Sequence, residues 1–417
     1  MLRKYDIHKF IVSLMVVLMF FSSTCLWSET NLGNYLKISI LIVGLAVLTA
    51  LIRGFSFHKF VNNRYVVWVV GVYTIFEFYG FMFLRIGQFN WDFVLFSGVL
   101  QICLTVAFMS LNNLEDTVSV FCVGCKWALL FVCIFMIVQG SLSFSNITFG
   151  SRLGDELSGN VNTVATNIGI MLIPTIYYAI RGNREKKIEI STWFIIALGT
   201  LCMVLTGSKK GLLVLGIAFM MYFIIVRTPI KYLILPALGI TGIYAIFNVP
   251  VLYNTIGFRV LDMFATFGIG TSITAAQSTA IRNSLIQQGA RSFLNHPIFG
   301  GGMNYFQYIN HARYYAHNNY IELLNDFGLV GTLIYYVPFA KALIRMVKKV
   351  RYVIKDEKDR RLYIFLISFI STKFVLDWAM VSFSALCTFT VPFLFVFEAL
   401  RMERERGSLS EERIINP

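Results

Sequence analysis

Long runs of hydrophobic residues, separated by short polar loops, fill most of this 417-residue chain. A helix needs roughly 20 apolar residues to cross a bilayer, and runs of about that length recur throughout. They lie near residues 9–27, 35–52, 65–84, 93–111, 118–139, 163–180, 190–206, 211–227, 231–249, 328–346, 362–379 and 384–400. The pattern predicts an all-α polytopic membrane protein, one multi-pass domain over residues 1–417 with about twelve transmembrane helices.

The composition supports a membrane protein and excludes three other classes. Hydrophobic residues make up 57% of the chain and charged residues 14%, whereas soluble domains have about 45–50% and about 25%. A soluble multidomain enzyme, a disulfide scaffold and a disordered chain are therefore excluded. The apolar stretch after Met1 lacks a small-residue cleavage site, so we interpret it as a retained first span.

The positive charge predicts the orientation of the chain. The formal net charge is +14, and basic residues gather in alternate loops and both tails, notably in 181–187, 348–361 and 401–406. Cytoplasmic loops carry the excess of Lys and Arg in membrane proteins, so both termini are predicted to be cytoplasmic. Since the cations lie in short loops between apolar runs, we attribute the charge to topology and membrane lipid, and expect no nucleic-acid partner.

This orientation leaves two sizeable loops on the outer side. One covers residues 141–162 and contains Arg152, and the other covers residues 250–327. Within the second, the stretch 277–295 has a helical pattern that ends at His296 and Pro297. The large loop is therefore predicted to contain short helices, and it is the only loop of the predicted topology that is large enough to build a further structure.

Two lysines lie on the outer side, where the charge rule disfavours them. They follow Ser208 in the turn Thr206–Gly211, and Ser208 is placed to N-cap the next span. Lys209 and Lys210 then occupy the first turn of that helix, where the macrodipole disfavours cations by roughly 0.3–1 kcal/mol each. An anion bound nearby would offset this cost, and helix N-termini bind anions. The alternative is that both lysines only reach lipid phosphates.

Two arginines of the large loop are predicted to point in opposite directions. Arg282 and Arg291 are nine residues apart in the expected helix, and about 100° per residue places them on opposite faces. Only one of them can then face a common pocket, and the other is a solvated or lipid-facing charge.

His317 is the candidate base of the outer side. If its segment is helical, His317 shares a face with Tyr320, Ile321 and Leu324, and Glu322 does not lie on that face. Neighbouring outer-side arginines should keep the imidazole neutral and able to accept a proton. The alternative is a structural histidine near the membrane surface. Further along, Gly328 permits close approach of another helix.

Three segments between Gly207 and Gly331 resemble the O-antigen ligase/polymerase superfamily, the Wzy-type polysaccharide polymerases and their lipopolysaccharide-ligase relatives. The first is the turn Thr206–Gly211 with the following Leu212 and Leu213. The second is Arg282 followed by Pro297-Ile-Phe-Gly-Gly-Gly and Phe306. The third is His317-Asn-x-Tyr-x-Glu-Leu-Leu, closing with Gly328-Leu-x-Gly331. The outer loop around Arg152 is similar to an arginine-containing loop of the family.

The resemblance implies an inverting, metal-independent glycosyltransferase that needs no cofactor and uses a polyprenyl-diphosphate-sugar donor. It implies His317 as the catalytic base and a diphosphate site made of Arg152, Arg282, Lys209 and Lys210. Asn318, Tyr320 and Glu322 are candidate contacts to the acceptor sugar. Where relatives often have arginine after the Gly-Ser, this chain has Lys209, which cannot bind a phosphate in bidentate fashion.

The favoured function is polymerisation of undecaprenyl-diphosphate-linked oligosaccharide repeat units into O-antigen or capsular polysaccharide. It would occur in the bacterial cytoplasmic membrane, with the active site facing the periplasm or exterior, and with a chain-length regulator membrane protein as a candidate partner. The first alternative is an O-antigen ligase that transfers the glycan to lipid A core or another acceptor. The second is a flippase for the lipid-linked oligosaccharide, which should instead concentrate charge within its spans.

Other polar residues within the spans have structural interpretations. Lys373 and Asp377 lie four residues apart, which favours a self-neutralising pair over a proton relay. Lys126 either pairs with Glu77 or snorkels. Cys122 and Cys125, within an apolar run, are predicted to pack and not to bind metal.

Overall fold

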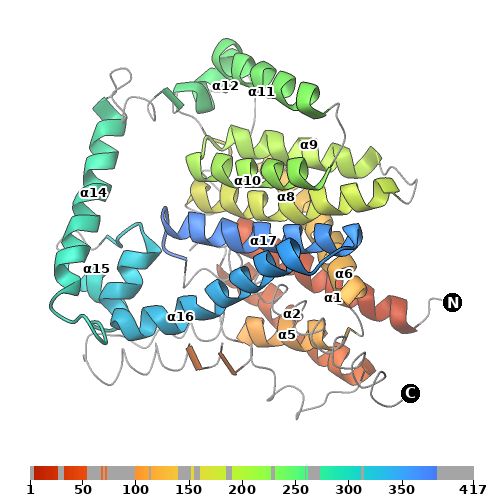
Figure 1. Ribbon diagram of the computed structural model, residues 1–417, viewed down its shortest axis with the longest axis horizontal. Helices are drawn as coiled ribbons and strands as arrows, with labels where there is room; N and C mark the ends of the chain where they lie inside the picture. Colours follow the sequence, from red (N-terminus) through yellow and green to blue (C-terminus); the bar gives the residue numbers. More distant parts are fainter. Residues whose placement is uncertain are drawn as a thin grey trace.

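The computed structural model describes residues 4–26, 32–53, 67–68, 71–72, 99–111, 114–139, 152–154, 160–184, 190–226, 231–258, 260–261, 273–310 and 314–382. Every regular element within these residues is helical (Figure 1), which confirms the all-α prediction for them. In chain order the elements are α1 (Lys4–Cys25), α2 (Leu32–Arg53), α5 (Leu100–Met109), α6 (Leu114–Gln139), α8 (Val161–Arg184), α9 (Ile190–Leu205), α10 (Lys209–Ile225), α11 (Lys231–Asn248), α12 (Pro250–Leu252), the π-helix η4 (Tyr253–Gly257), α14 (Ile273–Phe293), α15 (Tyr305–Ile309), α16 (Asn319–Tyr352) and α17 (Glu357–Asp377).

Five of the described helices are long and apolar enough to cross a membrane. They cover Ile7–Cys25, Gly33–Arg53, Leu114–Gln139, Val161–Arg181 and Asn319–Tyr352. These five, together with the shorter apolar helices, indicate a multi-pass membrane protein. The predicted span at 384–400 and most of the span at 65–84 lie outside the described residues, so the structure does not establish the total of twelve.

The core of the bundle depends on close helix crossings. A Cβ atom on Gly124 of α6 would come within 2.7 Å of Val16 of α1, and one on Gly169 of α8 within 2.8 Å of Val214 of α10. Small residues bring helices together in this way within membranes, where packing is the main source of association. Cys122 and Cys125 are buried in the same core as free thiols, as expected for packing residues.

Polar contacts gather at the two ends of the bundle. At the first, which we call the Glu115 end, Asp116 pairs with Lys9, and Glu115 pairs with Arg181 and Lys358. These pairs bring together the starts of α1, α6 and α17 and the last part of α8. The second, which we call the Arg152 end, comprises the residues around Arg152, the starts of α8, α10 and α16, and the end of α17.

Within the large loop, α14 and α15 lie outside the layered part of the bundle (Figure 1). In Figure 1, α8, α9, α10 and α17 run roughly parallel, and α14 stands across their ends at the left of the view. The helix expected at 277–295 is present as α14, Ile273–Phe293, which begins four residues earlier than predicted. The Asn325 side chain donates to the carbonyl oxygen of Gly289 at 3.0 Å and thereby ties α14 to α16.

Candidate functional site

The turn between α9 and α10 holds the arginine of the first outer loop. The Arg152 side chain donates through Nε to the carbonyl oxygen of Thr206 at 2.8 Å, and through Nη2 to Oδ1 of Asn162 at 3.1 Å. The same Asn162 oxygen accepts from the Ser208 hydroxyl at 2.9 Å. Asn162 therefore connects the arginine to the turn, a role that sequence reasoning missed.

Ser208 caps α10, as the sequence predicts. Its backbone is extended, with φ −88° and ψ 118°, and its hydroxyl accepts from the backbone N–H of Gly211 at 3.4 Å. The cap fixes the direction of the two lysines that follow. Lys209 is exposed, and Lys210 is partly buried.

Lys210 and Arg282 lie close enough to repel each other. The pKa of Lys210 is lowered to about 8, first because burial disfavours its charged form and second because of the Arg282 charge. The two cations come from different elements, the first turn of α10 and the middle of α14. Arg282 itself is exposed, as is Arg291. Of the two arginines, Arg282 is the one whose charge lowers the pKa of Lys210. This agrees with the prediction that only one of them faces the site.

His317 completes this cationic group, but it does not lie on a helix. Its φ is +53°, and α16 begins only at Asn319, so the prediction that it shares a helical face with Tyr320 is wrong. The pKa of His317 is lowered to about 4, by burial first and then by the charges of Arg282 and Lys210. The imidazole is therefore neutral at pH 7, as predicted, and its ring lies 4.1 Å from that of Tyr315 between centroids.

Hydrogen bonds on both sides hold His317 in this left-handed conformation. Before it, the N–H of Ala316 donates to Oε2 of Glu322 at 2.6 Å. After it, the Asn318 side chain caps α16 by accepting from the N–H of Ile321 at 3.1 Å, and donates to the carbonyl oxygen of Trp378 at 3.3 Å. A non-glycine residue at positive φ costs of order 1–3 kcal/mol, and such residues gather at functional sites.

The three candidate acceptor contacts each have a partner inside the protein. Asn318 is the cap just described, and Glu322 is buried while it binds the N–H of Ala316. The Tyr320 hydroxyl donates to the carbonyl oxygen of Phe374 at 2.9 Å, and its ring stacks on Tyr336. These contacts show how the three residues shape the His317 loop.

The glycine segment Gly300–Gly302 packs its backbone against α16. The N–H groups of Gly301 and Gly302 donate to the carbonyl oxygens of Asn325 and Asp326, both at 2.7 Å. Gly328 has φ +63° and kinks α16 at this place, and a Cβ on it would collide with the backbone of Ile298. The close approach predicted for Gly328 therefore exists, but its partner is this loop segment and not another helix.

Asp326 is a further residue that sequence reasoning missed. It is buried, and its carboxylate accepts from the N–H groups of Asn304 at 3.0 Å and Phe306 at 3.3 Å, which fixes the start of α15. The only sequence signal is an acidic residue two positions before Gly328.

A buried ion pair stabilises the helix ends next to the site. Lys373 and Asp377 are 2.9 Å apart and fully buried, so the predicted pair is confirmed. Asp377 also accepts from the Tyr336 hydroxyl at 2.7 Å and from the Asn319 side chain at 3.4 Å. Since Asn319 is the first residue of α16, the pair joins the start of α16 to the end of α17.

Lys126 has an aromatic environment. Its ammonium group lies 5.4 Å from the centroid of Trp127 and 4.9 Å from that of Tyr178. Glu77, the alternative partner, lies outside the described residues.

The arrangement brings cations and a neutral base together at one end of the protein. Arg152 comes from the loop before α8, Lys210 from the first turn of α10, Arg282 from α14 and His317 from the loop before α16. Within the described part of the chain, no group of three His, Cys, Asp or Glu residues is placed to hold a metal ion. Guanidinium and ammonium groups beside a proton acceptor are suited to binding a phosphorylated substrate and accepting a proton from a second one.

Comparison with known families agrees with this chemistry. The family model described as O-antigen ligase, Wzy_C, matches residues 194–336. The match includes the Ser208 turn, Arg282 and His317, whereas Arg152 lies before it. No curated protein matches the chain. Members of the family are glycosyltransferase-like enzymes, ligases and polymerases that act on lipid-linked glycans. Residues 194–336 are thus similar to the O-antigen ligase family, and the resemblance of this region to the O-antigen ligase/polymerase superfamily is confirmed.

Proposed function

We propose that the protein polymerises lipid-linked oligosaccharide repeat units, with undecaprenyl diphosphate as the carrier. The observation that supports this most is the meeting of Lys210, Arg282 and His317 at the Arg152 end, within the region that the family model matches. The donor diphosphate binds the cations, and an acceptor sugar hydroxyl faces His317. The enzyme is an inverting glycosyltransferase whose charge neutralisation comes from side chains, without a metal ion.

The cations favour this kind of donor because they repel one another in its absence. Lys210 and Arg282 both disfavour a proton on His317, and Arg282 disfavours the charge on Lys210. A diphosphate placed among them removes the repulsion and accepts hydrogen bonds from guanidinium and ammonium groups, which are stronger than neutral hydrogen bonds. Arg152, held by Thr206 and Asn162, and the exposed Lys209 extend this diphosphate site.

His317 is the general base in the proposed step. The acceptor hydroxyl oxygen forms a bond to the anomeric carbon of the donor sugar as the bond from that carbon to the diphosphate oxygen breaks. The hydroxyl proton passes to His317, and the electron pair of the broken bond leaves with undecaprenyl diphosphate. A bound diphosphate raises the pKa of His317 from about 4 by offsetting the nearby cations, which brings the base closer to the operating pH.

The residues around His317 orient the acceptor in this proposal. Asn318, Tyr320 and Glu322 shape the loop through their internal hydrogen bonds, and the acceptor sugar binds against that loop. The Tyr315 ring, next to the imidazole, offers a face on which a sugar ring can stack.

The proposed setting is the bacterial cytoplasmic membrane. The Glu115 end is cytoplasmic in this proposal, because Arg181 and Lys358 of two strongly basic loops belong to it, and both termini are expected on the same side of the membrane from the charge pattern. The Arg152 end, with Arg152 and the described helices α14 and α15 of the catalytic loop 250–327, then faces the periplasm or exterior. A chain-length regulator membrane protein is the expected partner of a polymerase at this place.

A ligase is the second candidate, favoured by the description of the matching family as O-antigen ligase. It would use the same donor site and the same base. The difference is the acceptor, which for a ligase is lipid A core or another molecule instead of a second lipid-linked glycan.

The deciding experiment uses the purified full chain in detergent with undecaprenyl-diphosphate-linked repeat units and a chelator. A ladder of lengthening products on a gel is the expected result. Single-step transfer that needs added lipid A core would establish the ligase instead. No transfer with either acceptor would refute both.

Two variants and one control test the assigned roles. His317→Ala should abolish chain growth with unchanged abundance in the membrane, and Arg282→Ala should reduce growth strongly. Arg291→Ala is the matched control, since it removes the same charge from the same helix and should have a much smaller effect. Normal growth of the His317 variant would remove the base from the mechanism, and equal effects of the two arginine variants would contradict the site.

A further inference from the structure

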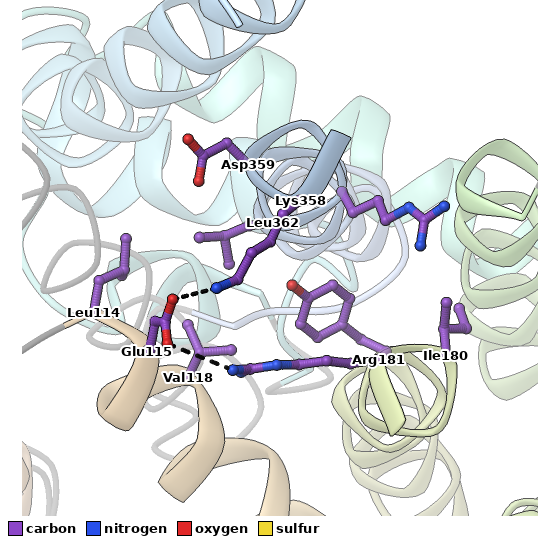
Figure 2. A pocket seen from close by; sticks show the side chains of 10 residues that line it. Leu114, Glu115, Val118, Ile180, Arg181, Lys358, Asp359 and Leu362 are labelled. Carbon is purple, nitrogen blue, oxygen red and sulfur yellow. Dashed lines mark hydrogen bonds and ion pairs between the residues drawn. The ribbon is translucent and has the colours of Figure 1, made fainter. Parts of the chain in front are cut away.

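A cavity of about 170 Å³ opens at the Glu115 end, opposite the candidate catalytic site. It lies between the first turn of α6, the end of α8 and the first turns of α17 (Figure 2). Roughly 10–15 Å³ suffices for a single water molecule, so this space accepts a group of many atoms. The proposed glycosyl transfer does not use it.

The cavity is placed at the surface of the membrane. Glu115 and Arg181, which line it, are charged residues at the ends of two candidate spans, Leu114–Gln139 and Val161–Arg181. Charged residues at span ends lie at the level of the lipid headgroups. A ligand in this cavity therefore meets headgroups on one side and acyl chains on the other.

The lining has the two parts that a phospholipid requires. Its apolar wall includes Leu114, Val118, Ile180 and Leu362, the last of which comes from α17. Its rim carries Arg181, Lys358 and Arg361 against the two acids Glu115 and Asp359. Basic pockets between helices at a membrane surface bind anionic headgroups.

One carboxylate serves two of these cations. Figure 2 shows Lys358 and Arg181 reaching Glu115 from different helices. The Arg181–Glu115 pair is long, at 3.9 Å, and the Glu115 side chain is 50% exposed. Such exposed pairs contribute little to stability, so a phosphate can replace Glu115 without a large loss.

We propose that this cavity binds the headgroup of an anionic phospholipid, whose phosphodiester takes the place of the Glu115 carboxylate between Arg181 and Lys358. The glycerol and the first acyl carbons then lie against Val118, Ile180 and Leu362. Glu115 acts as the internal competitor of the lipid, which sets the affinity of the site.

Because Glu115 and the lipid compete for the same cations, removing the cations and removing Glu115 should change lipid binding in opposite directions. Binding of dioleoyl phosphatidylglycerol to the full chain in detergent is measured by native mass spectrometry. Replacing Arg181 and Lys358 by glutamine should weaken binding about 25-fold, since each cation near a membrane surface contributes about a five-fold change. Replacing Glu115 by glutamine should strengthen binding. Lys348→Gln, which removes an exposed cation of α16 that does not line the cavity, should change it less than two-fold.

Three results would overturn the proposal. Weaker binding in Glu115→Gln would show that the ion pairs only hold the helices together. Equal binding of dioleoyl phosphatidylcholine would show an apolar cleft without headgroup recognition. Displacement of the lipid by millimolar inorganic phosphate would assign the cavity to the free anion. Thermal unfolding of each variant checks the fold, and Glu115→Gln keeps the test decisive if the double variant does not fold.

Discussion

Replacing Asp377 by leucine should destabilise the protein strongly, because it leaves the Lys373 ammonium buried without its counter-ion. Both side chains of the pair are 0% exposed. Lys373 would keep hydrogen bonds to the Tyr335 hydroxyl at 2.9 Å and to Ser382 at 3.3 Å, but both groups are neutral. Removing one partner of a buried pair costs about 3–5 kcal/mol, and Lys373→Met should cost a similar amount by leaving a buried carboxylate.

The double variant Lys373→Met/Asp377→Leu should be more stable than either single variant. Apolar replacement of a whole buried pair is often close to neutral. Here it also removes the acceptor of the Tyr336 and Ser382 hydroxyls and of the Asn319 side chain. Losing such a partner costs about 1–3 kcal/mol. Since Asn319 still donates to the Tyr336 hydroxyl at 2.8 Å, we expect a total cost of about 1–3 kcal/mol.

The assay is thermal or denaturant unfolding of the four proteins in one detergent, analysed as a double-mutant cycle. Membrane abundance checks that each variant is inserted. Costs that simply add in the double variant would refute the reasoning, because they would mean that the two charges do not compensate each other in the folded protein.

Three further predictions concern the site. Arg282→Gln removes a charge that lowers the pKa of His317, so that pKa should rise from about 4 but stay below 6.5, since burial remains. Histidine NMR titration measures the pKa, and an unchanged value would show that the Arg282 charge does not act on His317. Gly328→Ala should cost about 2 kcal/mol or more of unfolding free energy at its positive φ, whereas Gly216→Ala, with open space around it, should stay within about 1 kcal/mol of the parent; similar melting temperatures would contradict the kink. Asn162→Ala should slow transfer by roughly 10- to 100-fold, because a hydrogen bond to a charged group contributes about 1.5–3 kcal/mol; unaltered product ladders would show that this anchor is dispensable.

Features set by local chemistry could be predicted from the sequence. The Ser208 cap follows from a serine placed directly before a helix, and the helix around Arg282 follows from periodicity that stops at a proline. The Lys373–Asp377 pair follows from its spacing of four residues. In each case the residues that interact are neighbours in the chain, so no knowledge of the tertiary fold was needed.

Features set by tertiary packing could not be predicted. The segment around His317 has a helical pattern, yet Glu322 binds the N–H of Ala316 and Asn318 caps the helix, so His317 lies outside it. Asn162 acts through a contact with the turn after α9. There its side chain accepts from Ser208, which lies 46 residues later in the sequence. Asp326 likewise binds N–H groups about 20 residues upstream. Periodicity carries no information on such distant partners.

The mutual repulsion of Lys210 and Arg282 has a consequence for turnover. In the proposed reaction the donor enters as a diphosphate diester and the carrier leaves as a diphosphate monoester, which bears more negative charge. The cations that stabilise the departing group therefore hold the spent carrier more tightly than the fresh donor. Product inhibition by undecaprenyl diphosphate is expected, and departure of the carrier into the bilayer, instead of bond formation between sugars, should limit the rate of chain growth.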